Sequence, residues 1–123
     1  TPMGTSKPPT DQRNRSRGQW GENLAAAYYE RHGCRIIDRN WRSKTGELDL
    51  VVRDGDTYVF SEVKARRTDL YGPAAAAVGI EKQRRIRQLG VKWLREHGLG
   101  HVRVRFDVIA ITGNNLDHLP DAF

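Results

Sequence analysis

Cysteine is nearly absent from this sequence: Cys34 is the only one in 123 residues. A disulfide within the chain and a zinc site built from several cysteines are therefore excluded. Long hydrophobic runs are also missing, and no apolar stretch approaches the roughly 18 residues that a membrane-spanning helix needs. No apolar stretch near the start follows a basic segment, as it would in a secretory signal. These absences predict a cytoplasmic protein without a membrane segment.

Acidic residues are in the minority. Fifteen Asp and Glu residues face twenty-one Lys and Arg residues, which gives a net charge of +6 at pH 7. A basic surface attracts polyanions, and nucleic acid is the commonest polyanion in a cytoplasm. An acidic membrane surface and a merely solvated surface are the alternatives. The length suits one domain and is too short for two of ordinary size.

The first 18 residues differ in composition from the rest. Four basic residues stand there against a single acid, which gives this segment a net charge of +3, and three prolines and no apolar periodicity accompany them. Such a composition predicts a disordered basic arm over residues 1–18, followed by one folded domain over residues 19–123. The functional interpretation of the arm is a phosphate-seeking tail, and the alternative is a solvated leader.

The folded part is predicted to be an α/β domain with a mixed sheet, because helical and strand periodicities are interspersed along it. The first expected helix has Leu24, Ala27 and Tyr28 as its apolar stripe and ends before Gly33. In chain order we expect a helix over 22–32, strands over 34–39, 47–53 and 57–65, a loop over 66–73, a short helix over 74–77, a helix over 81–97, a strand over 102–108, and a turn over 113–115 before a short C-terminal piece.

The chemistry-bearing residues fall on an expected hairpin. Asp49 lies on one strand, and Glu62 and Lys64 lie two residues apart on the next, hence on one face. A two-residue turn at Asp54–Gly55 would place Asp49 opposite Phe60, with Glu62 as its diagonal neighbour on the same face. A three-residue loop would send Glu62 to the other face. The turn therefore decides whether the site exists.

Glu47 shares the expected face of Asp49, so three carboxylates would repel one another and raise their own pKa values. A divalent cation would remove that conflict. Oxygen ligands, with no cysteine or histidine among them, favour Mg²⁺ or Mn²⁺ over Zn²⁺. Lys64 could then hold a water or stabilise charge on a phosphate. The alternative is an exposed hairpin face on which Lys64 and Glu62 are ordinary ion-pair partners.

Asp49, followed thirteen residues later by Glu62-Val63-Lys64, resembles the D…(D/E)-x-K signature of the PD-(D/E)XK nuclease superfamily, with Leu48 in place of the usual preceding proline. A wider ordered set is similar to the small bacterial YraN family, which is described as endonuclease-like with a fold like that of Holliday-junction resolvases. The set covers about Trp20 to Phe123, with Ser61 as a departure from the usual apolar residue. It consists of Gly21-Glu22, Ala25, Tyr28, Arg39-Asn40-Trp41-Arg42, Gly46-Glu47-Leu48-Asp49-Leu50, Phe60, Glu62-Val63-Lys64, Arg66, Phe106-Asp107-Val108 and Ala122-Phe123.

The resemblance implies a restriction-endonuclease-like mixed sheet flanked by helices, and a metal-dependent endonuclease that hydrolyses DNA phosphodiester bonds, on branched or repair intermediates. It implies Asp49 and Glu62 as metal ligands, with the Val63 carbonyl as a third. It further implies Lys64 as the residue that orients or deprotonates the attacking water. Glu22 resembles the extra acidic residue of junction resolvases that completes the metal shell. Resolvase-like folds often cut as dimers, which makes a homodimer an expectation.

Basic residues near the site are candidates for nucleic-acid contacts. Arg84 and Arg85 flank the apolar stripe of the long helix, Lys82 at its start is expected to point toward the site, and Arg66 follows the signature lysine. The alternative is that they only solvate their helix face. The competing function is a non-catalytic nucleic-acid-binding module or adaptor with a vestigial nuclease site.

The remaining candidates point to structure rather than chemistry. Cys34 begins a strand and is expected to be a small core side chain. The four histidines show no metal-ligand spacing and are expected at the surface or at helix ends; they are His32, His97, His101 and His118.

Overall fold

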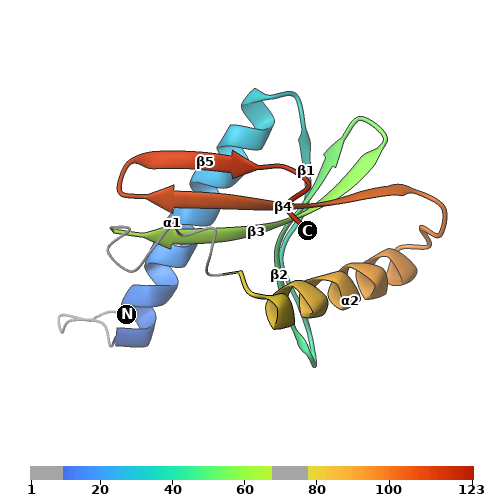
Figure 1. The fold of residues 1–123 in the computed structure, drawn as a ribbon, viewed down its shortest axis with the longest axis horizontal. Helices are drawn as coiled ribbons and strands as arrows, with labels where there is room; N and C mark the ends of the chain where they lie inside the picture. The colour runs from blue at the N-terminus through green and yellow to red at the C-terminus, as the bar shows by residue number, and fades with distance from the viewer. Residues whose placement is uncertain (1–9, 68–77) are drawn as a thin grey trace, which may run out of the picture.

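The computed structural model describes residues 10–67 and 78–123, with the side chains of α1 described from Gly18 onward. Two helices flank a five-stranded sheet (Figure 1). The helices are α1 (Thr10–Arg31) and α2 (Ile80–Glu96), and the strands are β1 (Arg35–Ser43), β2 (Gly46–Asp54), β3 (Thr57–Arg66), β4 (Arg103–Thr112) and β5 (Asn115–Leu119). Within these residues neither helix is long and apolar enough to cross a membrane.

The sheet is mixed, as the sequence predicts. Its strands lie in the order β1-β2-β3-β4-β5. Three neighbouring pairs are antiparallel, whereas β3 and β4 are parallel. A parallel pair needs a long crossover connection, and α2 lies within that connection. The α/β prediction is confirmed, and the arrangement is consistent with a restriction-endonuclease-like fold.

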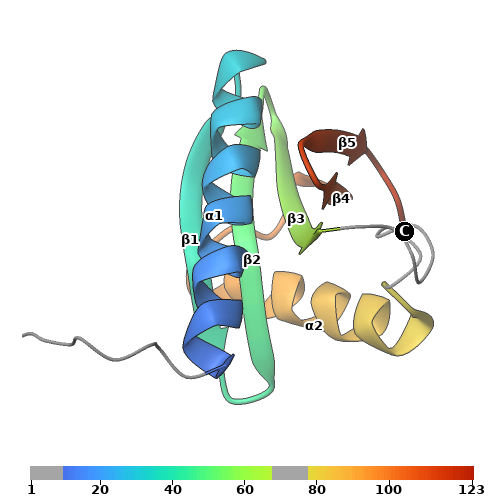
Figure 2. The same ribbon diagram turned by 90° about the vertical axis from the view of Figure 1, so that its left-hand side faces the viewer.

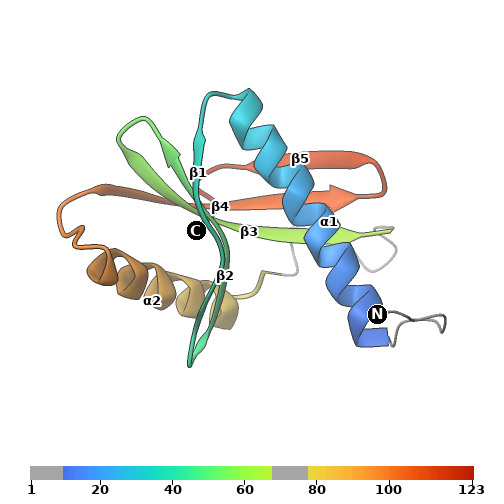
Figure 3. The ribbon, with the colours of Figure 1, turned by 180° about the vertical axis from the view of Figure 1, so that it is seen from behind.

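Each helix covers its own face of the sheet. α1 crosses one face (Figure 3), and α2 lies against the other (Figure 2). The cluster beneath α1 includes Ala25 and Tyr29 together with Leu50 of β2. The cluster beneath α2 includes Leu89 together with Phe60 of β3. Neighbouring residues of one strand point to opposite faces, so both faces of the central strands are apolar.

The first helix differs from its prediction in extent and in orientation. It begins at Thr10, so residues 10–18 are helical and not part of a disordered arm; residues 1–9 lie outside the described part. Its buried side chains are Ala25, Ala26 and Tyr29, whereas Leu24 is 37% exposed. The predicted stripe was wrong because small alanines on several sides leave the helical periodicity ambiguous. The predicted short helix over 74–77 also lies outside the described residues.

The β2–β3 turn has two residues, as predicted, but at a different position. Asp54 pairs with Thr57 and Leu50 with Ser61, so the turn residues are Gly55 and Asp56. Gly55 adopts a φ of 60°, which glycine reaches without steric cost. The register is shifted by two residues from the predicted one, which keeps every side chain on its predicted face. The shift brings Asp49 level with Glu62 itself and not diagonal to it.

Candidate active site

The site lies where β2 and β3 separate. Their ladder ends at the pair Leu50 and Ser61. Beyond that pair β2 bends away, while β3 continues beside β4 as far as Arg66 (Figure 1). Asp49 is the first residue of β2 on the far side of the split. A gap in the sheet therefore opens next to this carboxylate.

The bend is shared by β1. Asn40 has a φ of 54°, and its neighbours Arg39 and Trp41 pair with Leu50 and Leu48 on either side of Asp49. Asparagine is among the few residues other than glycine that adopt this left-handed conformation readily. Leu48 packs beneath α2 whereas Leu50 packs beneath α1. The hairpin thus changes face at the level of Asp49.

Asp49 completes the hydrogen bonding of the neighbouring strand. Its Oδ2 accepts a hydrogen bond from the backbone N–H of Val63 at 2.9 Å. That N–H belongs to the part of β3 that has lost its β2 partner. Because a strand residue directs its N–H and its carbonyl to the same side, the Val63 carbonyl faces the side on which Asp49 lies. This orientation agrees with the predicted role of that carbonyl as a metal ligand.

The carboxylates of Asp49 and Glu62 lie close enough to repel each other. Removal from water raises the pKa of Asp49 well above its ordinary value, and the negative charge of Glu62 raises it further. The hydrogen bond from the Val63 N–H opposes this rise in the pKa of Asp49. Glu62 is buried, with 6% of its surface exposed. The predicted mutual repulsion of these acids is confirmed in direction at Asp49.

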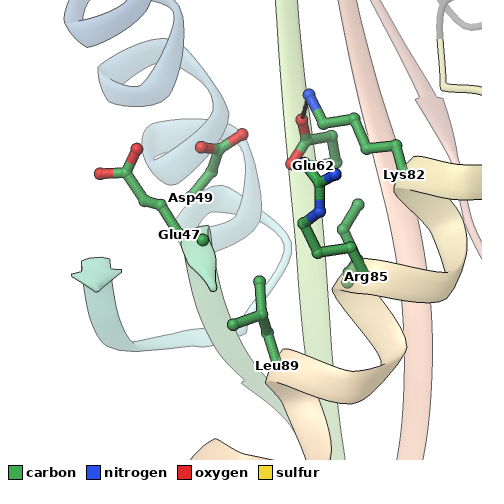
Figure 4. A pocket seen from close by; sticks show the side chains of 8 residues that line it. Glu47, Asp49, Glu62, Lys82, Arg85 and Leu89 are labelled. Atoms are coloured by element: carbon green, nitrogen blue, oxygen red, sulfur yellow. Dashed lines mark ion pairs between the residues drawn. The ribbon is translucent and has the colours of Figure 1, made fainter. Parts of the chain in front are cut away.

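Two cations of α2 face this acidic pair (Figure 4). Lys82 forms an ion pair with Oε2 of Glu62. Arg85 lies one turn further along the helix, and its stem packs close to Gly46. Together β2, β3 and α2 enclose a cleft of about 190 Å³. Its lining residues are Gly46, Glu47, Asp49, Glu62, Lys82, Arg85, Ile86 and Leu89.

Glu22 approaches the cluster from α1. Burial raises the pKa of Glu22, and the charges of Glu47 and Glu62 add to this rise, although a hydrogen bond from the Asn40 side chain opposes it. Glu22 and Glu47 also border a second hollow of about 400 Å³ on the α1 side of the β1–β2 hairpin. Glu47 itself is exposed and forms an ion pair with Arg42 at 3.3 Å. The predicted approach of Glu22 to the acidic group is therefore present.

Lys64 lies two residues beyond Glu62 on β3 and is half-buried. Among the described residues it forms no ion pair, and it does not line the cleft. Lys82 and not Lys64 is the lysine that the structure brings to Glu62. The role of Lys64 toward an attacking water stays a prediction.

Of the four residues predicted to contact nucleic acid, two point into the cleft and two do not. Arg85 and Lys82 line the cleft, as the sequence predicts for Lys82. Arg84 points elsewhere and pairs with Glu81 at 3.0 Å on the exposed side of the helix. Arg66 ends β3, where its carbonyl accepts a hydrogen bond from the N–H of Gly113. Nucleic-acid binding by these four residues stays a prediction.

The donor set of the cleft fits a hard divalent cation. Within residues 10–67 and 78–123, no three His, Cys, Asp or Glu side chains are placed to hold one ion. Asp49 and Glu62 therefore supply two carboxylates, with a backbone carbonyl beside them. Mg²⁺ is commonly bound by one or two carboxylates together with waters and substrate phosphates, so a third side chain is not required. Whether Glu22 joins as a ligand stays a prediction.

A second buried polar cluster was missed by sequence reasoning. Asp107 is fully buried and accepts two hydrogen bonds from Arg105, at 2.9 and 3.1 Å. His118 lies 2.7 Å from it, and the Tyr29 hydroxyl 2.9 Å. His118 is thus not a surface or helix-end residue, as predicted, but part of this network. Ser61 lies 2.8 Å from the Tyr29 hydroxyl, which explains a polar residue at this core position.

The sequence does contain one sign of this cluster: Asp107, in Phe106-Asp107-Val108, is an acid in the middle of an apolar strand.

Cys34 packs half-buried against the core beneath α1, as predicted, and burial raises the pKa of its thiol. Trp93 is buried, and its indole N–H donates to Asp38 at 3.0 Å.

The chain matches known proteins over most of its length. Residues 21–111 match the model of the family described as "Uncharacterised protein family UPF0102". A UPF0102 protein of Rhodococcus jostii is 50% identical over 115 residues, which are 89% of this chain and 98% of that protein. One of Geobacter sulfurreducens is 50% identical, covering 89% of this chain and 90% of that protein. One of Yersinia pseudotuberculosis is 45% identical, covering 89% and 95%. The chain belongs to the UPF0102 family, the YraN family that its motifs resemble.

Proposed function

We propose that this protein is a Mg²⁺- or Mn²⁺-dependent endonuclease that hydrolyses DNA phosphodiester bonds. The observation that carries the proposal is the cleft that Asp49 and Glu62 both line, where the Asp49 carboxylate is held by the Val63 N–H. Two negative charges cannot both be accommodated there without a cation. The basic side chains at the same cleft, Lys82 and Arg85, supply the complementary charge for a phosphate.

Residues that line the cleft and their neighbours on β3 have distinct roles in this proposal. Asp49, Glu62 and the Val63 carbonyl would hold the divalent ion. When bound, such an ion polarises a scissile phosphate and lowers the pKa of a bound water. Lys64, on the same strand, would orient that water and stabilise the charge that develops on the phosphate. Arg85 would hold the phosphate backbone beside the ion.

The shape of the molecule supports a branched DNA substrate. The tip of the β1–β2 hairpin projects beyond α2 (Figures 1 and 3). The cleft lies on the α2 side of this hairpin, and the hollow bordered by Glu22 lies on the α1 side. A projecting hairpin with a hollow on either side suits a substrate whose two strands separate, such as a flap or a four-way junction. Cutting two symmetric strands of a junction would call for a homodimer.

A non-catalytic nucleic-acid-binding module or adaptor is the second candidate. The observation that favours it is the ion pair between Lys82 and Glu62, which engages one of the two carboxylates. A vestigial site can retain such a pair as an ordinary structural contact. In this case the net charge of +6 would serve binding alone.

One assay separates the two candidates. Purified parent protein is incubated with Mg²⁺ or Mn²⁺ and single-stranded, duplex, flap or four-way DNA. We expect cleavage that requires the divalent ion and that falls by about 10² to 10³ in Lys64→Ala, the usual loss when one charge-stabilising group is removed. Glu62→Gln should bind metal weakly and be partly rescued by excess Mn²⁺.

Glu81→Gln is the matched control, because Glu81 is an exposed acid of α2 whose ion pair is with Arg84. Its cleavage rate should equal that of the parent. A Lys64→Ala protein that cuts as fast as the parent would assign the cleavage to other residues. If no variant cuts any substrate while all bind DNA, the binding-module function replaces the nuclease.

A further inference from the structure

The contact between Lys82 and Glu62 joins a half-exposed cation to a buried anion. The Lys82 side chain is 45% exposed, and that of Glu62 is 7% exposed. Lys82 belongs to the first turn of α2, which begins at Ile80. A cation is unfavourable at this end of a helix, because the helix dipole is positive there. The charge of Lys82 therefore does not stabilise α2 itself. It stabilises the buried carboxylate of Glu62.

Each acid of the cluster has its own partner, and that of Glu62 is the ammonium of Lys82. Glu47 has Arg42 as its partner, and Glu22 has the Asn40 amide and the charge of Arg39. Asp49 accepts a hydrogen bond from the backbone N–H of Val63. The ammonium of Lys82 neutralises Glu62 through its Oε2 (Figure 4). A divalent ion on the same carboxylate would lie within a few ångströms of this ammonium and repel it.

Lys82 and Arg85 differ in their freedom to move. The Arg85 stem is packed against Gly46, where even an added methyl group would lie 3.2 Å from its Cδ. The Lys82 side chain is 45% exposed, and its ammonium sits on a flexible four-carbon stem. If Glu62 is taken by another cation, the ammonium can rotate while remaining at the cleft that Lys82 lines.

We propose that Lys82 is an internal counter-cation that competes with the divalent metal ion for Glu62. In the metal-free protein it keeps the Glu62 carboxylate ordered and neutralised. When the metal binds, the ammonium is displaced into the cleft, where it contacts the phosphate that the metal also contacts. This inference rests on the proposed function, because it takes Glu62 to be a metal ligand. It adds a residue that sets metal affinity and couples it to phosphate binding.

The test compares Lys82→Met with Arg95→Met. Arg95 is an exposed cation in the last turn of the same helix, so its replacement removes the same net charge far from the cleft. Free Mn²⁺ is measured by electron paramagnetic resonance during titration of each metal-free protein. We expect Lys82→Met to bind Mn²⁺ about three- to fivefold more tightly than the parent, the upper part of the range for loss of one partly exposed competing ion pair. Arg95→Met should bind within about twofold of the parent.

Phosphate binding should change in the opposite direction. With saturating Mn²⁺, the affinity of Lys82→Met for a short DNA duplex should fall several-fold more than that of Arg95→Met. Lys82→Arg, which keeps a cation, should restore DNA affinity to near that of the parent. A lysine with only a structural role would not produce tighter metal binding together with weaker DNA binding. Far-ultraviolet circular dichroism establishes that each variant is folded.

The experiment distinguishes a failure of the proposed role of Lys82 from a failure of the proposed function. Mn²⁺ binding by the parent with unchanged or weaker binding by Lys82→Met overturns the role of Lys82 and leaves the proposed function intact. Mn²⁺ binding by neither protein overturns both. Binding by Lys82→Met but not by the parent supports the competition in its strongest form. Equal DNA affinities of Lys82→Met and Arg95→Met would remove the phosphate contact from the proposal.

Discussion

Asp49 and Asp107 are both aspartates withdrawn from water, and their surroundings have opposite effects on them. Burial alone would raise the pKa of Asp107, but hydrogen bonds from Arg105 and His118 lower it below its ordinary value. At Asp49 burial and the charge of Glu62 both raise the pKa, and one backbone N–H opposes them. One carboxylate is surrounded by donors, and the other by acids.

This difference separates a structural acid from the acid of the proposed metal site. Asp107 receives hydrogen bonds from β4, β5 and α1, so its charge ties three elements together. Among the described residues, no cationic side chain pairs with Asp49, so a deficit of positive charge remains around its carboxylate. Natural proteins normally hydrogen-bond or pair a buried charge, so a remaining deficit is typical of a site that takes up a cation.

The largest expected effect is on stability at Asp107. Asp107→Ala leaves the partly buried Arg105 with only its second partner, Asp54, and removes an acceptor from Tyr29 and His118. Loss of one partner of a buried ion pair costs about 3–5 kcal/mol. Urea unfolding should show this loss in the free energy of unfolding. A loss below about 1 kcal/mol would mean that Asp107 is as dispensable as a surface acid.

Asp49→Asn should have the opposite effect on stability. It removes a repelled charge and keeps an acceptor for the Val63 N–H, so the metal-free protein should gain about 1 kcal/mol. The parent should be stabilised by Mn²⁺ in a thermal melt and lose this gain with a chelator, because a ligand that binds only the folded state raises its stability. Asp49→Asn should show no Mn²⁺-dependent shift. A variant that is both less stable and still Mn²⁺-responsive would contradict the comparison.

The two acids should also give opposite pH dependences in the presence of a chelator. The ordinary pKa of both is 3.8. At Asp49, whose folded pKa is raised, the favourable contribution is present below 3.8 and is lost as the pH rises through the raised value. At Asp107, whose folded pKa is lowered, the contribution is present above 3.8 and is lost as the pH falls through the lowered value.

Urea unfolding of the parent, Asp49→Asn and Asp107→Asn between pH 3 and pH 7 measures this contrast. From low to neutral pH, Asp49→Asn should become more stable relative to the parent, and Asp107→Asn less stable. Parallel profiles for the two variants would show that the two sites are electrostatically alike.

The smallest expected effect concerns the backbone that shapes the acidic cluster. Asn40→Ala places alanine at a φ of 54°, which costs roughly 1 kcal/mol, and removes the amide that hydrogen-bonds Glu22. Asn40→Gly removes the same amide without the backbone strain. The difference in unfolding free energy between the two variants measures the strain, less the entropic cost of ordering glycine. Equal stabilities would show that the bend at Asn40 is not held by its conformation.

Local patterns predicted the β2–β3 hairpin and its two carboxylates. The alternation of apolar and polar residues predicted which face each side chain occupies. These faces are correct although the predicted turn position was wrong, because Asp54–Gly55 and Gly55–Asp56 are both two-residue turns. The first is suited to a type I′ turn and the second to type II′, so sequence alone did not choose between them. A register error of two residues leaves every side chain on its face.

Long-range contacts account for what the sequence did not predict. The ion pair of Lys82 with Glu62 joins residues separated by a crossover connection. The network at Asp107 draws on α1, β4 and β5, and nothing local marks His118 as its partner. The bend at Asn40 depends on the sheet splitting beside Asp49. These features arise from tertiary placement, which no short periodicity encodes.

The hydrogen bond from the Val63 N–H to Asp49 has a consequence for how this chain can change in evolution. An acceptor at position 49 covers a strand edge that would otherwise be open to pairing with another molecule. Under the proposed function, selection for solubility and selection for metal binding therefore act on the same side chain. A lineage that loses the proposed activity should drift from Asp49 toward asparagine, which still covers the edge, more readily than toward alanine. An exposed edge after loss of the acceptor would make self-association the first penalty, ahead of any loss of activity.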